Sequence, residues 1–182
     1  MLGFSVDGLK DALGGGYLIL VYGVGVLAML LSVAAFQFKR RVTIILCNFF
    51  GQTCWVVYFL LQGDLTSAIA CALTAAMLAV FAKKDDWKWV SSPLCILGFG
   101  ILLAGFPLLS FGVWSDIFPL AAGIFAVVAN SRSDERTLRI YSLFWCLSWL
   151  LNSAFKVYPV AFANDLLSTV SAAVALRRYR KK

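Results

Sequence analysis

Long apolar stretches recur along the whole chain, and they decide which folds are open to it. A helix needs about 20 mostly apolar residues to cross the hydrocarbon core of a bilayer. Stretches of this kind predict seven spans, at residues 16–36, 42–62, 65–82, 89–106, 113–130, 139–157 and 159–176. The chain is 62% hydrophobic and 14% charged, whereas a soluble domain is about half apolar and about a quarter charged. The sequence therefore predicts an all-α integral membrane protein.

The boundary between the fourth and fifth spans depends on turn signals, because residues 89–130 contain no Lys or Arg. This stretch is too long for one membrane helix and long enough for two with a tight turn. Pro107 and residues 112–116 place the turn between them. Before the first span, residues 2–13 mix apolar and polar side chains, and we expect either a short interfacial helix or a frayed end there.

Basic residues gather on one side of the predicted bundle. Of the 16 Lys and Arg residues, 14 fall in the connections after the first, third and fifth spans or in the C-terminal tail; the others are Lys10 and Lys156. Because short loops rich in Lys and Arg stay in the cytoplasm, this distribution predicts a cytoplasmic C-terminus and an external N-terminus. It also accounts for the net charge of +7 without nucleic acid, which we do not expect as a partner.

The side chains available for catalysis or metal binding are few. The chain contains no histidine, and its five cysteines lie in apolar stretches without C-x-x-C spacing. Buried cysteines of this kind usually serve as small packing residues. No H-E-x-x-H motif is present, and no Ser or Cys has a plausible base. We therefore expect no metal site, no cofactor and no enzymatic activity.

An internal repeat appears when the sequence is shifted by 94 residues. The shift aligns Trp55 with Trp149 and brings the basic ends of the third and seventh spans into register. One span lies between the halves, so both halves cross the membrane in the same direction. The expected architecture is two parallel three-helix bundles joined by a linker helix. Its parts are an interfacial segment (1–15), the first bundle (16–83), the linker region (84–112), the second bundle (113–178) and a basic tail (179–182).

This 3+1+3 order resembles the SWEET and PQ-loop superfamily of small-solute carriers. The segment YGVGVLAMLLSVAAFQFKRR, followed by a span with Trp55 and Tyr58 and then by GDLTSAIA, is more closely similar to YgjV-type bacterial inner-membrane proteins. The resemblance implies a SWEET-like fold in the bacterial inner membrane. SWEET-type carriers hold solute between a Trp on the second helix of each bundle and an Asn on the third, and Trp149 and Asn164 match this pattern. The first half has Ala70 in place of the Asn, and the PQ dipeptide is absent.

Polar and aromatic side chains form stripes along the predicted spans. Asn48, Gln52 and Trp55 lie at i, i+4 and i+7 and therefore share one face of the second span. On the sixth span, Trp145 and Trp149 share a face in the same way. These stripes either hold helices together through hydrogen bonds of about 1 kcal/mol each or line a solute pocket. The candidate solute-binding residues are Trp55, Trp149, Asn164, Asn152, Gln52 and Asn48.

Asp165 is the most costly residue in the predicted spans, because an ionised carboxylate in hydrocarbon costs about 2.5–3.5 kcal/mol unless it is paired or hydrated. It either pairs with Lys156, stays protonated, or binds a proton or cation during transport. Counted from the basic ends, Asp165, Trp149 and Asn164 lie about 15–21 Å into a core about 30 Å thick. Carriers bind solute at this depth. Asp116 is expected at the water boundary, near the outer end of the fifth span.

Two functions fit these features. One is a carrier that moves a small, mostly neutral solute (a sugar, a polyol or a vitamin-like nucleoside) by alternating access. The alternative is a non-transporting partner-binding or assembly protein on the same fold. The two differ in whether the face with Trp149 and Asn164 opens onto a cavity or is filled by side chains. The lipid bilayer and a small solute are the expected partners, and the sequence leaves the oligomeric state open.

Overall fold

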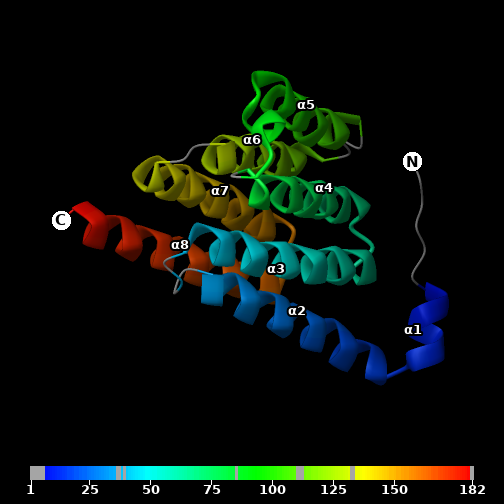
Figure 1. Ribbon diagram of the computed structural model, residues 1–182. Helices are drawn as coiled ribbons and strands as arrows, with labels where there is room; N and C mark the ends of the chain where they lie inside the picture. The colour runs from blue at the N-terminus through cyan, green and yellow to red at the C-terminus, as the bar shows by residue number, and fades with distance from the viewer. Residues whose placement is uncertain are drawn as a thin grey trace.

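The computed structural model describes residues 7–35, 38, 40–84, 86–109, 113–131 and 134–180 (Figure 1). Within them the chain forms eight α-helices and two short 3₁₀ helices, with no β-strand, so the predicted all-α class is confirmed. In chain order these are α1 (Asp7–Leu13), α2 (Gly16–Ala35), α3 (Arg41–Leu61), α4 (Leu65–Ala82), η1 (Lys88–Ser91), α5 (Pro93–Leu109), η2 (Trp114–Asp116), α6 (Ile117–Ser131), α7 (Glu135–Phe155) and α8 (Pro159–Arg180).

Several of these helices suit a membrane by length and composition. In the described chain, four segments are long and apolar enough to cross one: Gly16–Ala35, Val42–Leu61, Leu65–Ala82 and Trp114–Ser131. The segments Pro93–Phe106 and Pro159–Val174 are shorter apolar helices. α7 has 21 residues but is not in either group, because Glu135, Arg136 and Arg139 in its first turns and the polar side chains farther along lower its mean hydropathy. The helices thus support a multi-pass membrane protein without fixing the number of spans at seven.

Three helices, α5, α6 and α7, begin four residues away from the predicted span starts, and before α6 the residues Trp114–Asp116 form the 3₁₀ helix η2. α7 begins before residue 139 because Asp134 caps it: the Asp134 carboxylate accepts hydrogen bonds from the backbone N–H of Thr137 (2.9 Å) and from its hydroxyl (2.6 Å). The same hydrogen bonds hold the pKa of this exposed carboxyl below its usual value. α5 begins at Pro93 rather than at residue 89, since a proline lacks the N–H that the first helical turn leaves unused.

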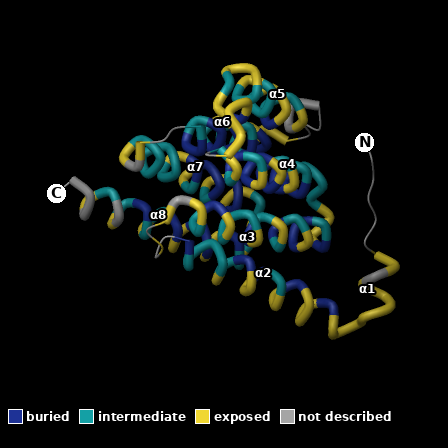
Figure 2. The backbone as a smooth tube through the Cα atoms, viewed as in Figure 1, coloured by how far each residue is buried: buried dark blue, intermediate teal, exposed yellow. Residues whose placement is uncertain are grey.

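The helices pack as two groups with α5 on the outside. α3 contacts both α2 and α4, and α7 contacts both α6 and α8. The groups meet where α2 contacts α8 and where α4 contacts α6, while α5 lies against α4 and α6 (Figure 1). If α2, α3 and α4 take the places of α6, α7 and α8, and the reverse, the α2–α8 contact becomes the α6–α4 contact. A two-fold arrangement of the groups gives this equivalence. Figure 2 shows the buried positions on the faces that the helices turn toward each other, with α1 exposed beyond the end of α2.

The backbone repeats with the same interval as the sequence. α3 and α7 are both 21 residues long and begin 94 residues apart, and α4 and α8 begin with the same offset. The turns between them also agree, because Gly63 (φ 74°) and Val157 (φ 56°) both adopt the left-handed conformation. In each turn the next amide bonds to the carbonyl five residues earlier, at 2.9 Å in the first half and 3.1 Å in the second. This agreement supports an internal repeat.

The contact between α2 and α8 depends on a small residue. A Cβ atom at Gly25 would lie 2.8 Å from Cγ1 of Val160 and 3.0 Å from a ring carbon of Tyr58, so only glycine fits without displacement. Small residues at such positions let membrane helices approach closely. On the outer surface of the bundle, large apolar side chains such as Ile19 of α2 and Leu94 of α5 are exposed, as contact with lipid requires.

The predictions for the two ends of the chain can be compared with the structure only over the described residues. α1 (Asp7–Leu13) covers the later part of the interfacial helix expected at 2–13, and residues 2–6 of that prediction lie outside the described residues. At the other end, α8 continues to Arg180, into the segment predicted as a basic tail. Residues 181–182 are likewise outside the described residues.

Candidate functional site

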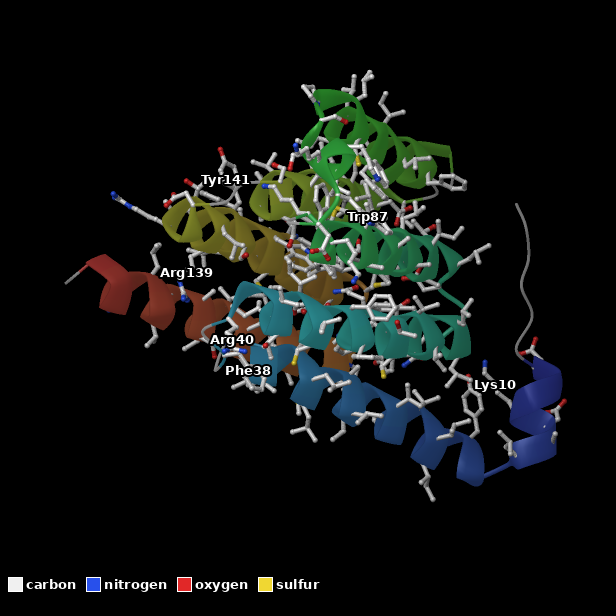
Figure 3. The ribbon with its side chains drawn as sticks, in the orientation of Figure 1. Lys10, Phe38, Arg40, Trp87, Arg139 and Tyr141 are labelled. Atoms are coloured by element: carbon white, nitrogen blue, oxygen red, sulfur yellow. The ribbon has the colours of Figure 1, made fainter. Side chains whose placement is uncertain are left out.

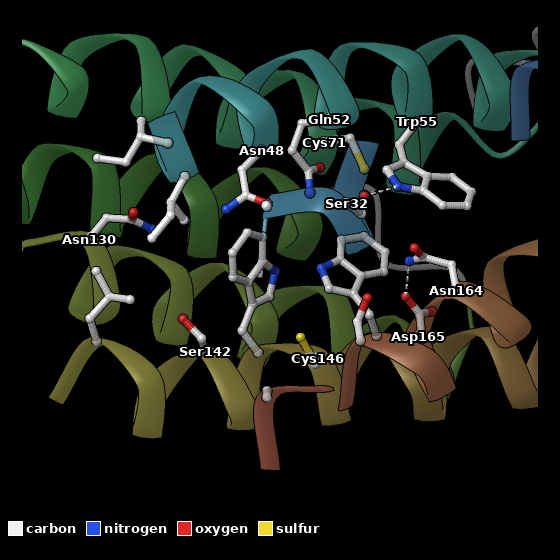
Figure 4. Close-up of a pocket in the computed structure, with 18 of the residues that line it drawn as sticks. Ser32, Asn48, Gln52, Trp55, Cys71, Asn130, Ser142, Cys146, Asn164 and Asp165 are labelled. Carbon is white, nitrogen blue, oxygen red and sulfur yellow. Dashed lines mark hydrogen bonds between the residues drawn. The ribbon is translucent and has the colours of Figure 1, made fainter. Parts of the chain in front are cut away.

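A cavity of about 110 Å³ lies between the two helix groups, with α2 and α3 on one side and α7 and α8 on the other (Figure 4). A space of this size holds several water molecules or a small organic molecule. Of the residues predicted to bind solute or an ion, those that line the cavity are Asn48, Gln52, Trp55, Trp149, Asn164 and Asp165. Asn152 does not line it. It is fully buried nearer the end of α7, and neither side-chain polar atom has a hydrogen-bond partner within the described residues.

Helical spacing explains why the lining residues converge. Asn48, Gln52 and Trp55 follow one face of α3, as their spacing predicts, and this face is turned toward α7 and α8 (Figure 4). The sequence placed Trp145 on the same stripe as Trp149 but not among the candidate binding residues. Trp145 nevertheless lines the cavity. Its position four residues before Trp149 was the signal that could have identified it.

Aromatic rings form one end of the cavity. Phe59 stacks on Trp149 with ring centroids 6.0 Å apart and lies beside Trp55 at 5.8 Å. The indole N–H of Trp55 donates to the hydroxyl of Ser32 on α2, over 3.2 Å. The predicted pair Trp55 and Trp149 is therefore brought together across the two helix groups, with the ring of Phe59 between them.

Some polar groups that line the cavity have hydrogen-bond partners, and others have none in the described part of the chain. Asp165 accepts hydrogen bonds from Ser153 (2.5 Å) and from the Asn164 side-chain nitrogen (2.9 Å). Among the described residues, however, no partner exists for Oε1 of Gln52 or Oδ1 of Asn164, nor for the Trp145 indole N–H or the Ser168 hydroxyl. Buried polar groups are nearly always hydrogen-bonded. Four such atoms in one cavity indicate that it holds water or a polar ligand.

Of the three alternatives for Asp165, the pairing with Lys156 is wrong. Lys156 instead forms ion pairs with Asp64 and with Asp116, each at 3.0 Å. The reason is geometric: Lys156 follows the last residue of α7, and its side chain extends toward the α3–α4 turn and the start of α6, away from the cavity. The expectation that Asp116 lies near the outer water boundary of the membrane stays a prediction, and within the protein only 2% of Asp116 is exposed.

Asp64, Asp116, Lys156 and Tyr158 form a connected group, which we call the turn cluster. The Tyr158 hydroxyl donates to Asp64 over 3.2 Å, and the Ser67 hydroxyl donates to the same carboxylate over 2.7 Å. Burial and then the neighbouring Asp64 carboxylate raise the pKa of the Tyr158 phenol, which therefore stays protonated and able to donate. The turn cluster joins the first helix group, through Asp64, to the second.

The cavity is closed toward the turn cluster and extends in the other direction. The ring of Phe59 packs against Tyr158 at 5.8 Å and against Tyr58 at 5.3 Å, between the cavity and the turn cluster. At the opposite end the lining includes Phe38 and Arg139. Figure 3 shows these two side chains at the end of the bundle where Arg40 lies, with Lys10 near the other end. The cavity thus reaches the end of the bundle that carries most of the basic residues.

Metal ligands are not grouped anywhere in the described part of the chain. No set of three or more His, Cys, Asp or Glu side chains there is arranged to hold a metal ion. Two cysteines, Cys71 and Cys146, border the cavity as unpaired thiols. The lining of the cavity therefore offers aromatic rings, amides, hydroxyls, the two thiols, one carboxylate and, at the far end, the Arg139 guanidinium.

Comparison with known proteins identifies the family. A family model described as Imp-YgjV, bacterial inner membrane protein, matches residues 19–182. No curated protein and no solved structure matches the chain, so the resemblance to SWEET and PQ-loop carriers receives no support from these comparisons. The family match covers most of the chain and agrees with its apolar helices. The chain belongs to the Imp-YgjV family of bacterial inner membrane proteins.

Proposed function

We propose that this protein is a carrier that moves a small polar solute across the bacterial inner membrane by alternating access. The observation that carries the proposal is the cavity between the two helix groups, which contains several buried polar atoms without partners. Interhelical hydrogen bonding, the simpler explanation of the polar stripes, would have paired these atoms with neighbouring helices. The open cavity therefore favours a carrier over a partner-binding or assembly protein, and the proposal assigns no catalysis to the chain.

In this proposal α2 to α8 are the seven spans, arranged as two parallel three-helix bundles with α5 as the linker. The N-terminus is outside and the C-terminus is in the cytoplasm, as the distribution of Lys and Arg predicts. The turn cluster then lies on the external side, and the end of the cavity with Arg139 faces the cytoplasm. Support comes from the contacts of α2 with α8 and of α4 with α6, which are equivalent under exchange of the bundles.

Alternating access then requires the bundles to rock about the cavity. In the present conformation the turn cluster and the ring of Phe59 close the external side, while the cavity extends toward the cytoplasmic side. Opening to the outside would separate Asp64 from Lys156 and Tyr158, since these residues belong to different bundles. Closing the cytoplasmic end would bring α2 and α3 toward α7. In this proposal the conformation described here is the inward-facing one.

The test is binding and uptake with matched variants of α3. Gln52 lines the cavity, whereas Thr53 beside it is exposed and its hydroxyl is bonded within the helix. Purified protein is screened by thermal shift against sugars, polyols, nucleosides and amines, and solutes that stabilise it are tested for uptake into proteoliposomes. We expect Gln52→Leu to reduce uptake by about tenfold or more, and Thr53→Val to leave it unchanged. A protein that takes up nothing, although folded, would contradict the proposal.

A further inference from the structure

We infer that the solute of this cavity is an organic cation with an ammonium or guanidinium group, and that Asp165 binds this group. The inference rests on the proposed function and narrows its substrate class. The sequence led us to expect a mostly neutral solute, and it left a pairing of Asp165 with Lys156 open. Lys156 is bound to Asp64 and Asp116 instead, so this lysine does not compensate the Asp165 carboxylate.

The first observation is a carboxylate without a basic partner. Asp165 is only 8% exposed, and within the described residues no Lys or Arg forms an ion pair with it. The basic residue of the lining, Arg139, lies ten residues before Trp149 on α7, about 15 Å away along the helix. Figure 4 shows Asp165 and Asn164 at one end of the cavity and Ser142 and Asn130 toward the other. A buried carboxylate is stable only with a compensating charge or proton.

The second observation is a pair of unpartnered hydrogen-bond acceptors in the same cavity as the carboxylate. Oε1 of Gln52 and Oδ1 of Asn164 have no donor within the described residues, and they line the same cavity as the Asp165 carboxylate. An ammonium group has three donors and no acceptor, and a guanidinium has five donors. Either group matches this set of oxygens. A sugar hydroxyl, by contrast, brings an acceptor with each donor and leaves the negative charge without compensation.

The third observation is the set of aromatic rings. Trp145 and Trp149 both line the cavity, and Phe59 stacks on Trp149. Cations are attracted to the faces of indole rings, and desolvated contacts of this kind are the strong ones. The rings also provide an apolar surface for the body of the solute. A charged nitrogen at Asp165 with an apolar body against the two indoles uses the carboxylate and the aromatic rings together.

The experiment compares two ligands that differ in the charged group alone. Tyramine carries an ammonium group where tyrosol carries a hydroxyl, and the rest of the two molecules is the same. Binding to the purified wild-type protein is measured by thermal shift and by titration calorimetry at fixed salt. We expect tyramine to bind at least about tenfold more tightly than tyrosol, because charge-assisted hydrogen bonds are about twice as strong as neutral ones. Agmatine, which adds a guanidinium, should also stabilise the protein.

The variant Asp165→Asn keeps the shape of the side chain and removes its charge. We expect it to lose the preference for tyramine over tyrosol, while Asp134→Asn at the exposed start of α7 keeps it. If Asp165→Asn does not fold, the wild-type comparison of the two ligands still decides. Equal affinities for tyramine and tyrosol would overturn the cationic class and leave the carrier proposal intact.

Two further outcomes separate the inference from the proposed function. Stabilisation by Na⁺ alone that depends on Asp165, with no competition from amines, would overturn the inference and assign Asp165 to ion coupling. Binding and uptake of sugars or nucleosides, with no shift by tyramine or agmatine, would overturn the inference and support the carrier. The carrier proposal itself fails in a different experiment, the proteoliposome assay, if folded protein takes up no solute.

Discussion

Lys156 is the residue whose loss should cost the most stability. It lies 3.0 Å from each of two carboxylates, Asp64 and Asp116, and all three side chains are largely buried. Removing the ammonium leaves two buried carboxylates close together without the cation that they share. We expect Lys156→Met to lower the free energy of unfolding by about 3–5 kcal/mol, measured as a lower midpoint of thermal or denaturant unfolding in detergent.

A surface ion pair serves as the control for this change. Lys83 and Asp86 are 3.7 Å apart with both side chains more than half exposed. Lys83→Met should therefore change stability by less than about 1 kcal/mol. Equal effects of Lys156→Met and Lys83→Met would show that the turn cluster does not hold the bundles together.

The residue scale also shows why the partners of this lysine could not be read from the sequence. Asp165 is the nearest carboxylate within a predicted span, so the sequence could offer it only as one possible partner. The true partners, Asp64 and Asp116, come from a turn of the other bundle and from the start of α6. Which turns meet depends on how the bundles pack, and no helical periodicity contains that information.

At the scale of single elements, the α7–α8 turn stores backbone strain. Val157 adopts φ 56°, a conformation that costs a β-branched residue about 1–2 kcal/mol, whereas glycine tolerates it. The equivalent turn of the first half has Gly63 there. Because Val157 is 81% exposed, little packing is lost on substitution. We expect Val157→Gly to raise stability by about 1 kcal/mol and Gly63→Val to lower it by at least that amount, as measured by unfolding in detergent. A destabilising Val157→Gly would mean that the two turns are not equivalent.

The contact of α2 with α8 gives a second test at this scale. Gly25→Ala would place a methyl group 2.8 Å from Val160, so α2 must shift and stability should fall by about 1–3 kcal/mol. Gly23 is the matched control on the same helix, because nothing lies within 4 Å of a Cβ there. Gly23→Ala should be neutral or stabilising, since alanine favours helix. Melting temperatures of the two variants decide, and similar values would contradict the close approach.

How far the sequence predicts an element depends on what sets its ends. Apolar runs located α2, α3 and α4 closely, because their limits are set by polar turns. The start of α7 was missed although Asp134, three residues before Thr137, is a typical helix cap. On the binding face, spacing correctly grouped Asn48, Gln52 and Trp55. Spacing could not exclude Asn152, because it gives the face of a helix and not the depth at which Phe59 and Trp149 close the cavity.

At the scale of the whole molecule, topology is the property to test first. Reporter fusions at residues 84, 133 and 182 should report a cytoplasmic location, and a fusion at Gly63 an external one. Gly63 stands next to the turn cluster, so an external signal there places that cluster on the outside. A cytoplasmic signal at Gly63 would mean that the protein has the opposite orientation in the membrane, and the described conformation would then be outward-facing.

The membrane, the helices and the repeat could be read from composition and periodicity. The cavity could not, because an empty space depends on side-chain volumes from several helices at once. Trp145 and Trp149 might equally have filled the volume between the groups, and their stripe would look the same in the sequence. The unpartnered atoms of Gln52 and Asn164 are likewise a property of the assembled bundle.

The lack of a basic partner for Asp165 has a consequence for the energy source of transport. If the solute is a monovalent cation and nothing else moves, each turnover carries one positive charge across the membrane. A membrane potential of 100 mV, negative inside, is worth about 2.3 kcal/mol per charge. That energy alone would sustain a concentration gradient of roughly 50-fold toward the cytoplasm. Uptake into proteoliposomes should then generate a current and respond to a potassium diffusion potential, with no requirement for a proton or sodium gradient.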